Sequence, residues 1–331
     1  MTPSPSPSTL LVRLPNPLGD VVMTTPLLRA LRTAWPQCRI VTAGKAPYGA
    51  LLDGLDSVDA FLPLTDAEPH HQTLSKAEAD AALILPNSWS SAVAAARAGI
   101  PLRIGRRNQG RSVLLHKKLP PIPGPAPMTE LYCDFLPALG LPRRVPKAEL
   151  VVTRKPATPI PSHAKLIAVA PGAAFGPSKV YPMHLLEEVL EQLAGKHGFT
   201  PLLLGSPAEQ DLLQHLEQAL PYPTVRPAAE DLGLDETKAL LAASEVALCM
   251  DNGARHMAAA LGVPQVLLYG PTHPAWSAHG LEKTTILKRE ELDCLGCHHK
   301  ECPLPDHPCM NRITPDVVLA AVQQTAGQAS A

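Results

Sequence analysis

The 331-residue sequence lacks the features that define several large classes of protein. Its formal net charge is only -1, from 29 Lys and Arg against 30 Asp and Glu, which provides no general attraction for nucleic acid or anionic lipid. No segment reaches the ~20 apolar residues of a membrane-spanning helix. Residues 1–9 have neither the basic start nor the apolar run of a secretory signal. We therefore expect a cytoplasmic protein that binds no nucleic acid and has a disordered segment at residues 1–9.

Two motifs of common nucleotide enzymes are also absent. The turn at residues 15–19 lacks the Gly-x-Gly-x-x-Gly sequence of dinucleotide enzymes, which disfavours a dehydrogenase. The glycine-rich loop at residues 171–179 lacks the Gly-Lys-Ser/Thr order of P-loop kinases and ATPases. The seven cysteines are an odd number in a chain of this length, which argues against a secreted disulfide framework.

Short apolar segments typical of strands alternate along the chain with segments of helical spacing. This alternation predicts an α/β protein with parallel sheets covered by helices. The expected strands are residues 9–14, 39–43, 81–85, 166–170, 201–204, 246–250 and 265–269, and the expected helices are residues 90–98, 183–196, 209–220 and 256–261.

The chain length and two proline-rich stretches predict two domains. Residues 120–127 and 155–161 are too rich in proline for regular hydrogen-bonded structure, and a new apolar strand follows the second stretch at once. We predict an N-terminal domain at residues 10–154, a linker at residues 155–164 and a C-terminal domain at residues 165–331.

Three segments lie where parallel sheets bind ligands, in loops that follow a strand. The first, Asp251–His256, precedes a helix whose free N–H groups suit a diphosphate, and Gly253 permits close approach of the backbone. Helix capping by Asp251 or Asn252 and a packed His256 are the structural alternatives. The sequence thus leaves open whether this segment holds a ligand.

The other two segments offer one cation and one carboxylate. Lys179 ends the glycine-rich loop and is able to place a positive charge against phosphate oxygens, although the side chain could equally be solvated. Asp20, after the first strand, is either a helix cap or a base that takes a proton from an attacking hydroxyl.

In this order the segments resemble those of the ADP-heptose:lipopolysaccharide heptosyltransferases, glycosyltransferase family 9, and they are most similar to the heptosyltransferase II branch. The resemblance covers nearly the whole chain. It is carried by residues 13–36, the loop at 171–179, the Asp-x-Gly-x-x-His box at 251–256 and Leu-Tyr-Gly-Pro-Thr at 268–272.

The resemblance implies a GT-B fold, in which two facing Rossmann-like, doubly wound parallel-sheet domains bind the acceptor and the donor. It further implies that the N-terminal domain binds the acceptor and the C-terminal domain binds ADP-heptose, with the reaction in the cleft between them. The reaction would invert the anomeric centre, transfer heptose to the lipopolysaccharide inner core (lipid A-Kdo-heptose) and require no cofactor for catalysis.

The resemblance also assigns roles to individual residues. Asp20 is the expected catalytic base, with Gly19 and Arg13 beside it in acceptor binding, and Lys179 is expected to neutralise the departing diphosphate. The expected donor-binding residues are Gly172, Lys179, Asp251, Asn252, Gly253 and His256.

Two departures from the family pattern leave the identity of the sugar open. Asn252 stands where the family usually has Ser or Thr, and Val180-Tyr181 replaces Arg-Trp after Lys179. The alternatives are a glycosyltransferase that uses another nucleotide-sugar and a non-catalytic protein that binds a nucleotide-sugar.

A cysteine-rich segment at residues 294–309 has three interpretations. Its four thiols have the composition of a structural zinc site, but their later spacings are looser than in a zinc ribbon. A loop staple of reduced or partly oxidised cysteines and the packing of unpaired cysteines are the other two. The cysteines concerned are Cys294, Cys297, Cys302 and Cys309.

A basic stretch in the N-terminal half is interpreted in two ways. The resemblance to family 9 implies a membrane-anchored glycolipid acceptor, and this stretch could contact the inner face of the inner membrane. A solvated basic face is the other interpretation. The residues are Arg103, Arg106, Arg107, Arg111, Lys117 and Lys118.

Overall fold

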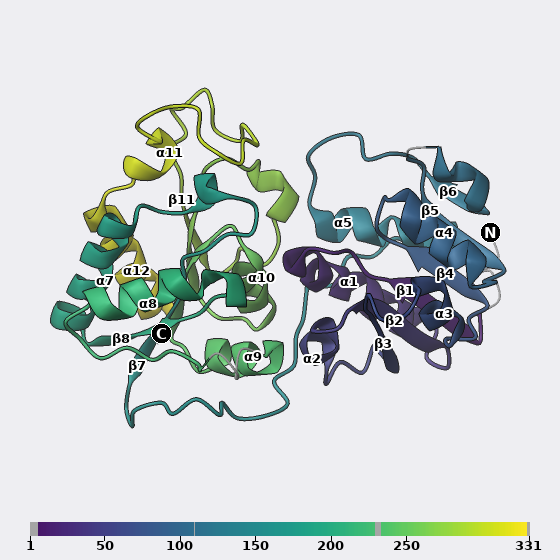
Figure 1. The fold of residues 1–331 in the computed structure, drawn as a ribbon, viewed down its shortest axis with the longest axis horizontal. Coiled ribbons are helices and arrows are strands. Elements are labelled where there is room, and N and C mark those ends of the chain that lie inside the picture. The colour runs from purple at the N-terminus through teal and green to yellow at the C-terminus, as the bar shows by residue number, and fades with distance from the viewer. Residues whose placement is uncertain (1–5, 109, 229–232, 330–331) are drawn as a thin grey trace. The chain divides into compact units, whose positions relative to one another are not determined.

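The computed structural model describes residues 6–108, 110–228 and 233–329 and divides into two compact units. The first unit is Met1–Val151 and the second is Val152–Ala331. Each unit contains one parallel sheet with helices packed against it (Figure 1). The prediction of two Rossmann-like α/β domains is therefore confirmed.

The sheet of the first unit has the strand order β3-β2-β1-β4-β5-β6, and every neighbouring pair is parallel. The order runs outward from β1 in both directions, so the connections leave on opposite sides at the β1/β4 boundary. Ligands of doubly wound sheets bind at such a boundary. The strands are β1 (Thr9–Arg13), β2 (Arg39–Lys45), β3 (Ala60–Leu64), β4 (Ala81–Ile84), β5 (Leu102–Arg106) and β6 (Lys117–Leu119).

The helices of the first unit cover this sheet, and α1 packs closely against α5. The α1 helix follows β1 directly and buries Val21, Val22, Leu27, Leu28 and Leu31 on its inner face. The helices are α1 (Leu18–Ala34), α2 (Tyr48–Leu52), α3 (His70–Ser75), α4 (Trp89–Arg97), α5 (Met128–Cys133) and α6 (Phe135–Ala138), with a 3₁₀ turn at Arg111–Leu114.

The sheet of the second unit has the parallel order β11-β10-β9-β7-β8, with its reversal between β7 and β9. The loops that follow β7 and β9 therefore meet at the carboxyl edge of the sheet. The strands are β7 (Lys165–Ala170), β8 (Phe199–Leu203), β9 (Val246–Met250), β10 (Gln265–Leu268) and β11 (Thr284–Leu287).

A large buried apolar cluster of the second unit joins its strands to α7, α8 and α12. The α10 helix packs against β9, β10 and α9. The helices are α7 (Met183–His197), α8 (Gln210–Ala219), α9 (Leu234–Ala242), α10 (Gly253–Ala260), α11 (Pro308–Asn311) and α12 (Pro315–Ala329), with 3₁₀ turns at Pro177–Lys179, Pro207–Glu209 and Pro274–Ser277.

The structure adds detail at two boundaries predicted from the sequence: the end of the disordered segment and the start of the linker. Thr9 belongs to β1, so the segment expected to be disordered overlaps a strand at that residue, while residues 1–5 lie outside the described part. The residues expected to begin the linker pack on α9, because the buried carboxylate of Glu236 accepts hydrogen bonds from the amides of Ala157 (2.9 Å) and Thr158 (2.8 Å).

Candidate functional site

An ion pair occupies the carboxyl edge of the second sheet. Lys179 Nζ lies 2.6 Å from Asp251 Oδ2 and donates to the Asp251 carbonyl at 2.8 Å, and both side chains are 10% exposed. Thr272 Oγ1 donates to the same carboxylate oxygen at 2.6 Å. Burial acts to raise the pKa of Asp251, but the Lys179 charge and the two donors outweigh it and hold that pKa below its usual range. The loops after β7, β9 and β10 thus converge on one charged carboxylate.

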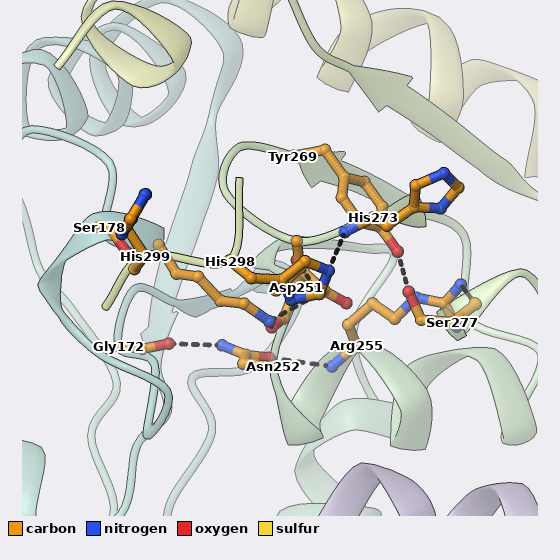
Figure 2. A network of polar contacts seen from close by, with 12 residues as sticks. Gly172, Ser178, Asp251, Asn252, Arg255, Tyr269, His273, Ser277, His298 and His299 are labelled. Carbon is orange, nitrogen blue, oxygen red and sulfur yellow. Dashed lines mark hydrogen bonds and ion pairs between the residues drawn. The ribbon is translucent and has the colours of Figure 1, made fainter. Parts of the chain in front are cut away.

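The loop that carries Lys179 is held by the cysteine-rich segment. Ser178 donates from its amide to the Lys300 carbonyl (3.1 Å) and from its hydroxyl to the His299 carbonyl (2.6 Å). His307 Nε2 lies 2.8 Å from the Ser178 carbonyl and therefore donates to it. Figure 2 shows Ser178 beside His299. Sequence reasoning did not foresee this contact, because more than a hundred residues separate its partners.

Gly176 is required at the start of this turn. Its φ is +151°, and an added Cβ would come within 2.6 Å of the Lys300 carbonyl oxygen. A side chain at this position would therefore push the loop away from residues 299–300.

The cysteine-rich segment also reaches the loop after β10. The amides of Gly296 (3.3 Å) and His298 (2.7 Å) donate to the carbonyls of Gly270 and Pro271, respectively. The His273 amide points at His298 Nε2 at 3.4 Å (Figure 2). The segment 294–309 is thus a frame for two of the three loops that meet at Asp251.

Asn252 caps α10 and also bridges the loop after β7. Its Oδ1 accepts from the Arg255 amide at 3.2 Å, which is an N-cap hydrogen bond. Its Nδ2 donates to the carbonyls of Ala170 (2.9 Å) and Gly172 (2.8 Å), as Figure 2 shows in part. Both amide hydrogens are thereby used inside the protein. The structural alternative of capping is correct for this side chain, and its place in the site is to hold Gly172 near α10.

Gly172 is packed tightly against an acidic side chain. An added Cβ at Gly172 would collide with the Glu209 carboxylate. Glu209 is itself oriented by a capping box, in which its carboxylate accepts from the Ser206 amide (2.7 Å) and hydroxyl (2.8 Å). Glu209 was not among the predicted site residues, although Ser-x-x-Glu is a readable capping signal.

His256 lies in the first turns of α10 and is buried, as the packed alternative predicted. Its Nδ1 lies 2.7 Å from Nε2 of His279, which also receives a contact from Arg255 Nη1 at 3.2 Å. Burial, followed by the positive charge of Arg255, lowers the pKa of His256 well below its ordinary value. Both imidazoles are therefore neutral near pH 7. Neither Arg255 nor His279 was expected to take part.

The first unit contains a pocket of about 290 Å³ around Asp20. Its lining comes from the loops after β1 and β4, at the strand-order reversal, and from α5 and its flanking residues. Asp20 lies in the first turn of α1, where Pro17 provides no side-chain cap. The lining residues are Pro15, Asn16, Pro17, Asp20, Leu85, Pro86, Asn87, Ser88, Arg106, Ile122, Met128, Leu131, Tyr132 and Phe135.

Tyr132 is the direct partner of Asp20 in this pocket. Burial raises the pKa of the Tyr132 phenol well above 10, and the negative charge of Asp20 and a hydrogen bond to its carboxylate add to the shift. The phenol is therefore protonated and donates to Asp20. Tyr132 was not predicted, because nothing in its local sequence distinguishes it from a core tyrosine.

Arg13 and Gly19 flank Asp20 in the sequence but have different positions. Arg13 is buried, and its guanidinium donates to the Leu14 carbonyl and to Asn16 Oδ1. Burial lowers the pKa of Arg13 to about 10. Arg13 thus supports the pocket loop from behind through Asn16, and Gly19 precedes Asp20 in the first turn of α1.

The interpretation of residues 103–118 as one basic face is wrong for two of its members. Arg106 is 5% exposed, pairs with Asp134 at 2.8 Å and lines the Asp20 pocket. Arg111 is fully buried and donates to the carbonyls of Arg106 (3.0 Å) and Ser88 (3.1 Å). Only Arg107 and Lys118 of the set are exposed.

The four clustered cysteines of residues 294–309 differ in their burial. All are free thiols, and no group of three or more His, Cys, Asp or Glu side chains among the described residues could hold a metal ion. Cys309 is buried whereas Cys297 is exposed. Burial, with a smaller effect from its three cysteine neighbours, raises the pKa of the Cys309 thiol to about 11, so it is protonated near pH 7.

Within the described part of the chain, no helix is long and apolar enough to cross a membrane.

The structure collects the predicted residues into two groups. Gly172, Lys179, Asp251, Asn252, Gly253 and His256 gather around the β7/β9 reversal in the second unit. Arg13, Gly19 and Asp20 gather near the β1/β4 reversal in the first. Two doubly wound units, each with a ligand-type loop arrangement at its strand-order reversal, have the architecture of the GT-B fold.

Comparisons with known proteins identify the family. The family model for "Glycosyltransferase family 9 (heptosyltransferase)" matches residues 68–307, and the chain therefore belongs to this family of glycosyltransferases.

The chain is 28% identical over 310 residues to lipopolysaccharide heptosyltransferase 2 of Escherichia coli K12, covering 84% of this chain and 87% of that protein. It is 27% identical to lipooligosaccharide heptosyltransferase 2 of Haemophilus influenzae, covering 95% and 98%. The solved structure of E. coli ADP-heptose LPS heptosyltransferase II matches with a TM-score of 0.82 and 27% identity, covering 98% of this chain and 100% of that chain. The predicted GT-B fold is thereby confirmed.

Proposed function

We propose that this glycosyltransferase transfers heptose from ADP-heptose to the heptose of a lipid A-Kdo-heptose acceptor in the lipopolysaccharide inner core. The membership of family 9 and the likeness to heptosyltransferases 2 support this reaction. The observation that carries the assignment of the donor site is the buried Lys179–Asp251 pair beside the start of α10.

The donor diphosphate is proposed to bind at this helix start. Gly253 is the first residue of α10, so the N–H groups of the first turn and the positive end of the helix dipole face a ligand there. Lys179 adds a full charge that is held in place by Asp251, Thr272 and the frame at residues 299–307. Asp251 itself therefore serves the loop geometry through its bonds to Lys179 and Thr272.

The acceptor is proposed to bind in the Asp20 pocket. Its lining combines apolar walls with the polar side chains of Asn16, Asn87, Ser88 and Arg106, which suits a hydroxyl-rich sugar. Asp20 takes the proton of the attacking hydroxyl, while Tyr132 holds the carboxylate by a hydrogen bond.

The chemistry is a single displacement. The acceptor oxygen forms a bond to the anomeric carbon as the bond from that carbon to the phosphate oxygen breaks, and ADP leaves with the electron pair. The configuration inverts because attack and departure occur on opposite faces. The negative charge that develops on ADP meets Lys179 and the first-turn N–H groups, so the reaction as proposed requires no cofactor.

We also propose that the protein works at the inner face of the inner membrane. The proposed acceptor is a glycolipid, and Arg107 and Lys118 are the exposed cations that remain from the basic stretch. Arg107→Gln with Lys118→Gln should reduce flotation with vesicles that contain anionic lipid. Unchanged flotation would remove these two residues from membrane contact.

The test of the reaction is a donor screen with purified protein. ADP should be released from ADP-heptose only when the heptosyl-Kdo-lipid A acceptor is present, and EDTA should not stop it. ADP-heptose binding without release would indicate a binding protein, and release of UDP or GDP from other nucleotide-sugars would identify a different donor.

A further inference from the structure

Arg255 and His256 of α10 form a buried chain of contacts with His279, and this chain has no part in the reaction described above. Arg255 is fully buried and His256 is 5% exposed. Arg255 Nη1 lies 3.2 Å from His279 Nε2, and His256 Nδ1 lies 2.7 Å from the same nitrogen. The ring centroids of the two histidines are 5.0 Å apart and their planes differ by 11°. With the two nitrogens 2.7 Å apart, the ring centroids are separated by 5.0 Å when the line between the nitrogens passes through both rings. The hydrogen shared by these nitrogens therefore lies in the plane of both rings.

The direction of each hydrogen bond follows from Arg255. A guanidinium only donates, so Nε2 of His279 accepts and carries no hydrogen. The guanidinium is fixed in this position because its Nη2 donates to the carbonyls of Ser277 (2.7 Å) and His279 (3.0 Å). With His279 Nε2 as an acceptor, His256 Nδ1 must be the donor in the 2.7 Å contact.

His256 has only this one proton. Burial and the charges of Arg255 and Lys179 keep its pKa well below the ordinary value, and burial lowers the pKa of His279 to about 3 against a small opposing effect of Glu282. A neutral ring with a proton on Nδ1 has its lone pair on Nε2.

We infer that His279, oriented by Arg255, is a positioning residue that holds His256 as the Nδ1–H tautomer, so that Nε2 of His256 accepts a hydrogen bond from a sugar hydroxyl of the donor. The second half of this inference rests on the proposed function. An unprotonated nitrogen repels a phosphate oxygen, so the diphosphate is left to Lys179 and the N–H groups of α10. His256 then recognises a hydroxyl of the heptose or of the ribose.

The tautomer is testable without any ligand. In protein labelled with ¹⁵N at histidine, His256, assigned by the loss of its signals in His256→Gln, should show a protonated Nδ1 and an unprotonated Nε2 at pH 7. His279→Phe keeps a ring but removes the acceptor, and should release His256 to the Nε2–H form. His279→Gln supplies a carbonyl acceptor and should restore Nδ1–H. A wild-type His256 with hydrogen on Nε2 would overturn the inference.

The ligand half is tested by calorimetry with ADP and with ADP-heptose. His256→Phe and His279→Phe should weaken binding about tenfold, as expected for one lost hydrogen bond, and His279→Gln should recover most of it. A loss confined to ADP-heptose assigns the hydroxyl to heptose, and an equal loss for ADP assigns it to ribose. Unchanged affinities, or proton uptake by the wild type on binding ADP at pH 7, would overturn the acceptor role.

These two tests separate the inference from the proposed function. If the wild-type protein binds neither ADP nor ADP-heptose, the proposed function fails, whereas the spectrum still decides the tautomer. If ADP-heptose binds and His256 carries its hydrogen on Nε2, the proposed function stands and the positioning role of His279 is wrong.

Discussion

The two units use an aspartate after a sheet strand in opposite ways. Asp251 is buried against a lysine, and Thr272 also donates to it, so its charge is committed to holding the loops together. Asp20 lines an open pocket and accepts from the neutral phenol of Tyr132. A carboxylate paired with a cation is a poor base, whereas one held by a neutral hydroxyl retains more affinity for a proton. Similar topology thus produces a fixed structural charge in one unit and a candidate base in the other.

The largest expected effect is on Asp20. Asp20→Asn keeps the shape of the pocket but removes the base, and turnover should fall by about 10³-fold, within the usual contribution of general-base catalysis. ADP affinity and melting temperature should change little, because the proposed donor-binding residues belong to the other unit. Steady-state ADP release, calorimetry and thermal unfolding measure the three quantities.

The exposed Asp66 offers a matched control for this substitution. Asp66→Asn should retain full turnover. An Asp20→Asn enzyme with normal turnover would remove Asp20 from the role of base.

The opposite pattern is expected for Lys179, where stability and donor binding should fall together. Lys179→Met leaves the buried Asp251 carboxylate unpaired, at a cost of about 3 kcal/mol in the free energy of unfolding. Adding Asp251→Asn should recover most of that stability without restoring ADP binding. Urea unfolding and calorimetry separate the two effects. Recovery of ADP binding in the double variant would show that Lys179 acts only through the fold.

The neutral histidines predict a pH effect that belongs to the second unit. His256 and His279 have pKa values below that of an unfolded histidine, so the unfolded chain binds more protons and stability rises with pH. Their contribution is complete above about pH 6.5 and is lost as the pH falls toward about 3 for His279.

The free energy of unfolding should therefore decrease below pH 6.5 by about 1.4 kcal/mol per pH unit for each of these histidines. Asp251 adds its own loss only below its ordinary value of 3.8. In His279→Phe, the slope of the unfolding free energy against pH between pH 6 and 4.5 should be smaller by about 1.4 kcal/mol per pH unit, the contribution of one proton. An unchanged slope would show that His279 is not buried as the neutral form.

The smallest effect tests the double use of Asn252. Asn252→Ser keeps an oxygen that can cap α10 but loses both hydrogen bonds to the loop after β7, and Asn252→Ala loses the cap as well. The Ala variant should be less stable than the Ser variant by about 1 kcal/mol. Both variants should bind ADP less tightly, and to a similar extent, because both lose the hydrogen bond that holds the Gly172 carbonyl. Equal stability of the two variants would argue against the cap.

The sequence was sufficient for most of the buried strands and for several loop residues. Strands such as β7 and β9 are continuous apolar runs bounded by turn residues, so the strands and the loops that follow them can be predicted from the sequence. Four strands were not predicted: β3, β5, β6 and β11. A proline lies within β3, arginines interrupt the apolar residues of β5, and β6 and β11 are short and only partly apolar. The helix α10 begins at Gly253, earlier than expected, because Asn252 caps it.

The supporting residues of the sites could not be found in the same way. Tyr132, Arg255 and His279 act through partners that the fold brings close, and local spacing gives no sign of them. The burial of Arg106 and Arg111 was hidden for the same reason, since each satisfies its guanidinium with groups elsewhere in the unit. Residue type and spacing indicate chemistry, whereas orientation and tautomer come from tertiary packing.

The frame at residues 294–309 has a consequence for the order of folding. The hydrogen bond between His307 and Ser178 joins residues separated by 129 positions, so the loop that carries Lys179 emerges from the ribosome long before its partner. Contacts of such separation form late, because a long loop must close first. The first unit is complete by residue 151, yet the Lys179 loop reaches its final form only when nearly the whole chain has been made. A nascent chain therefore passes through a stage that has its carboxylate pocket and lacks the finished loop of the proposed diphosphate site.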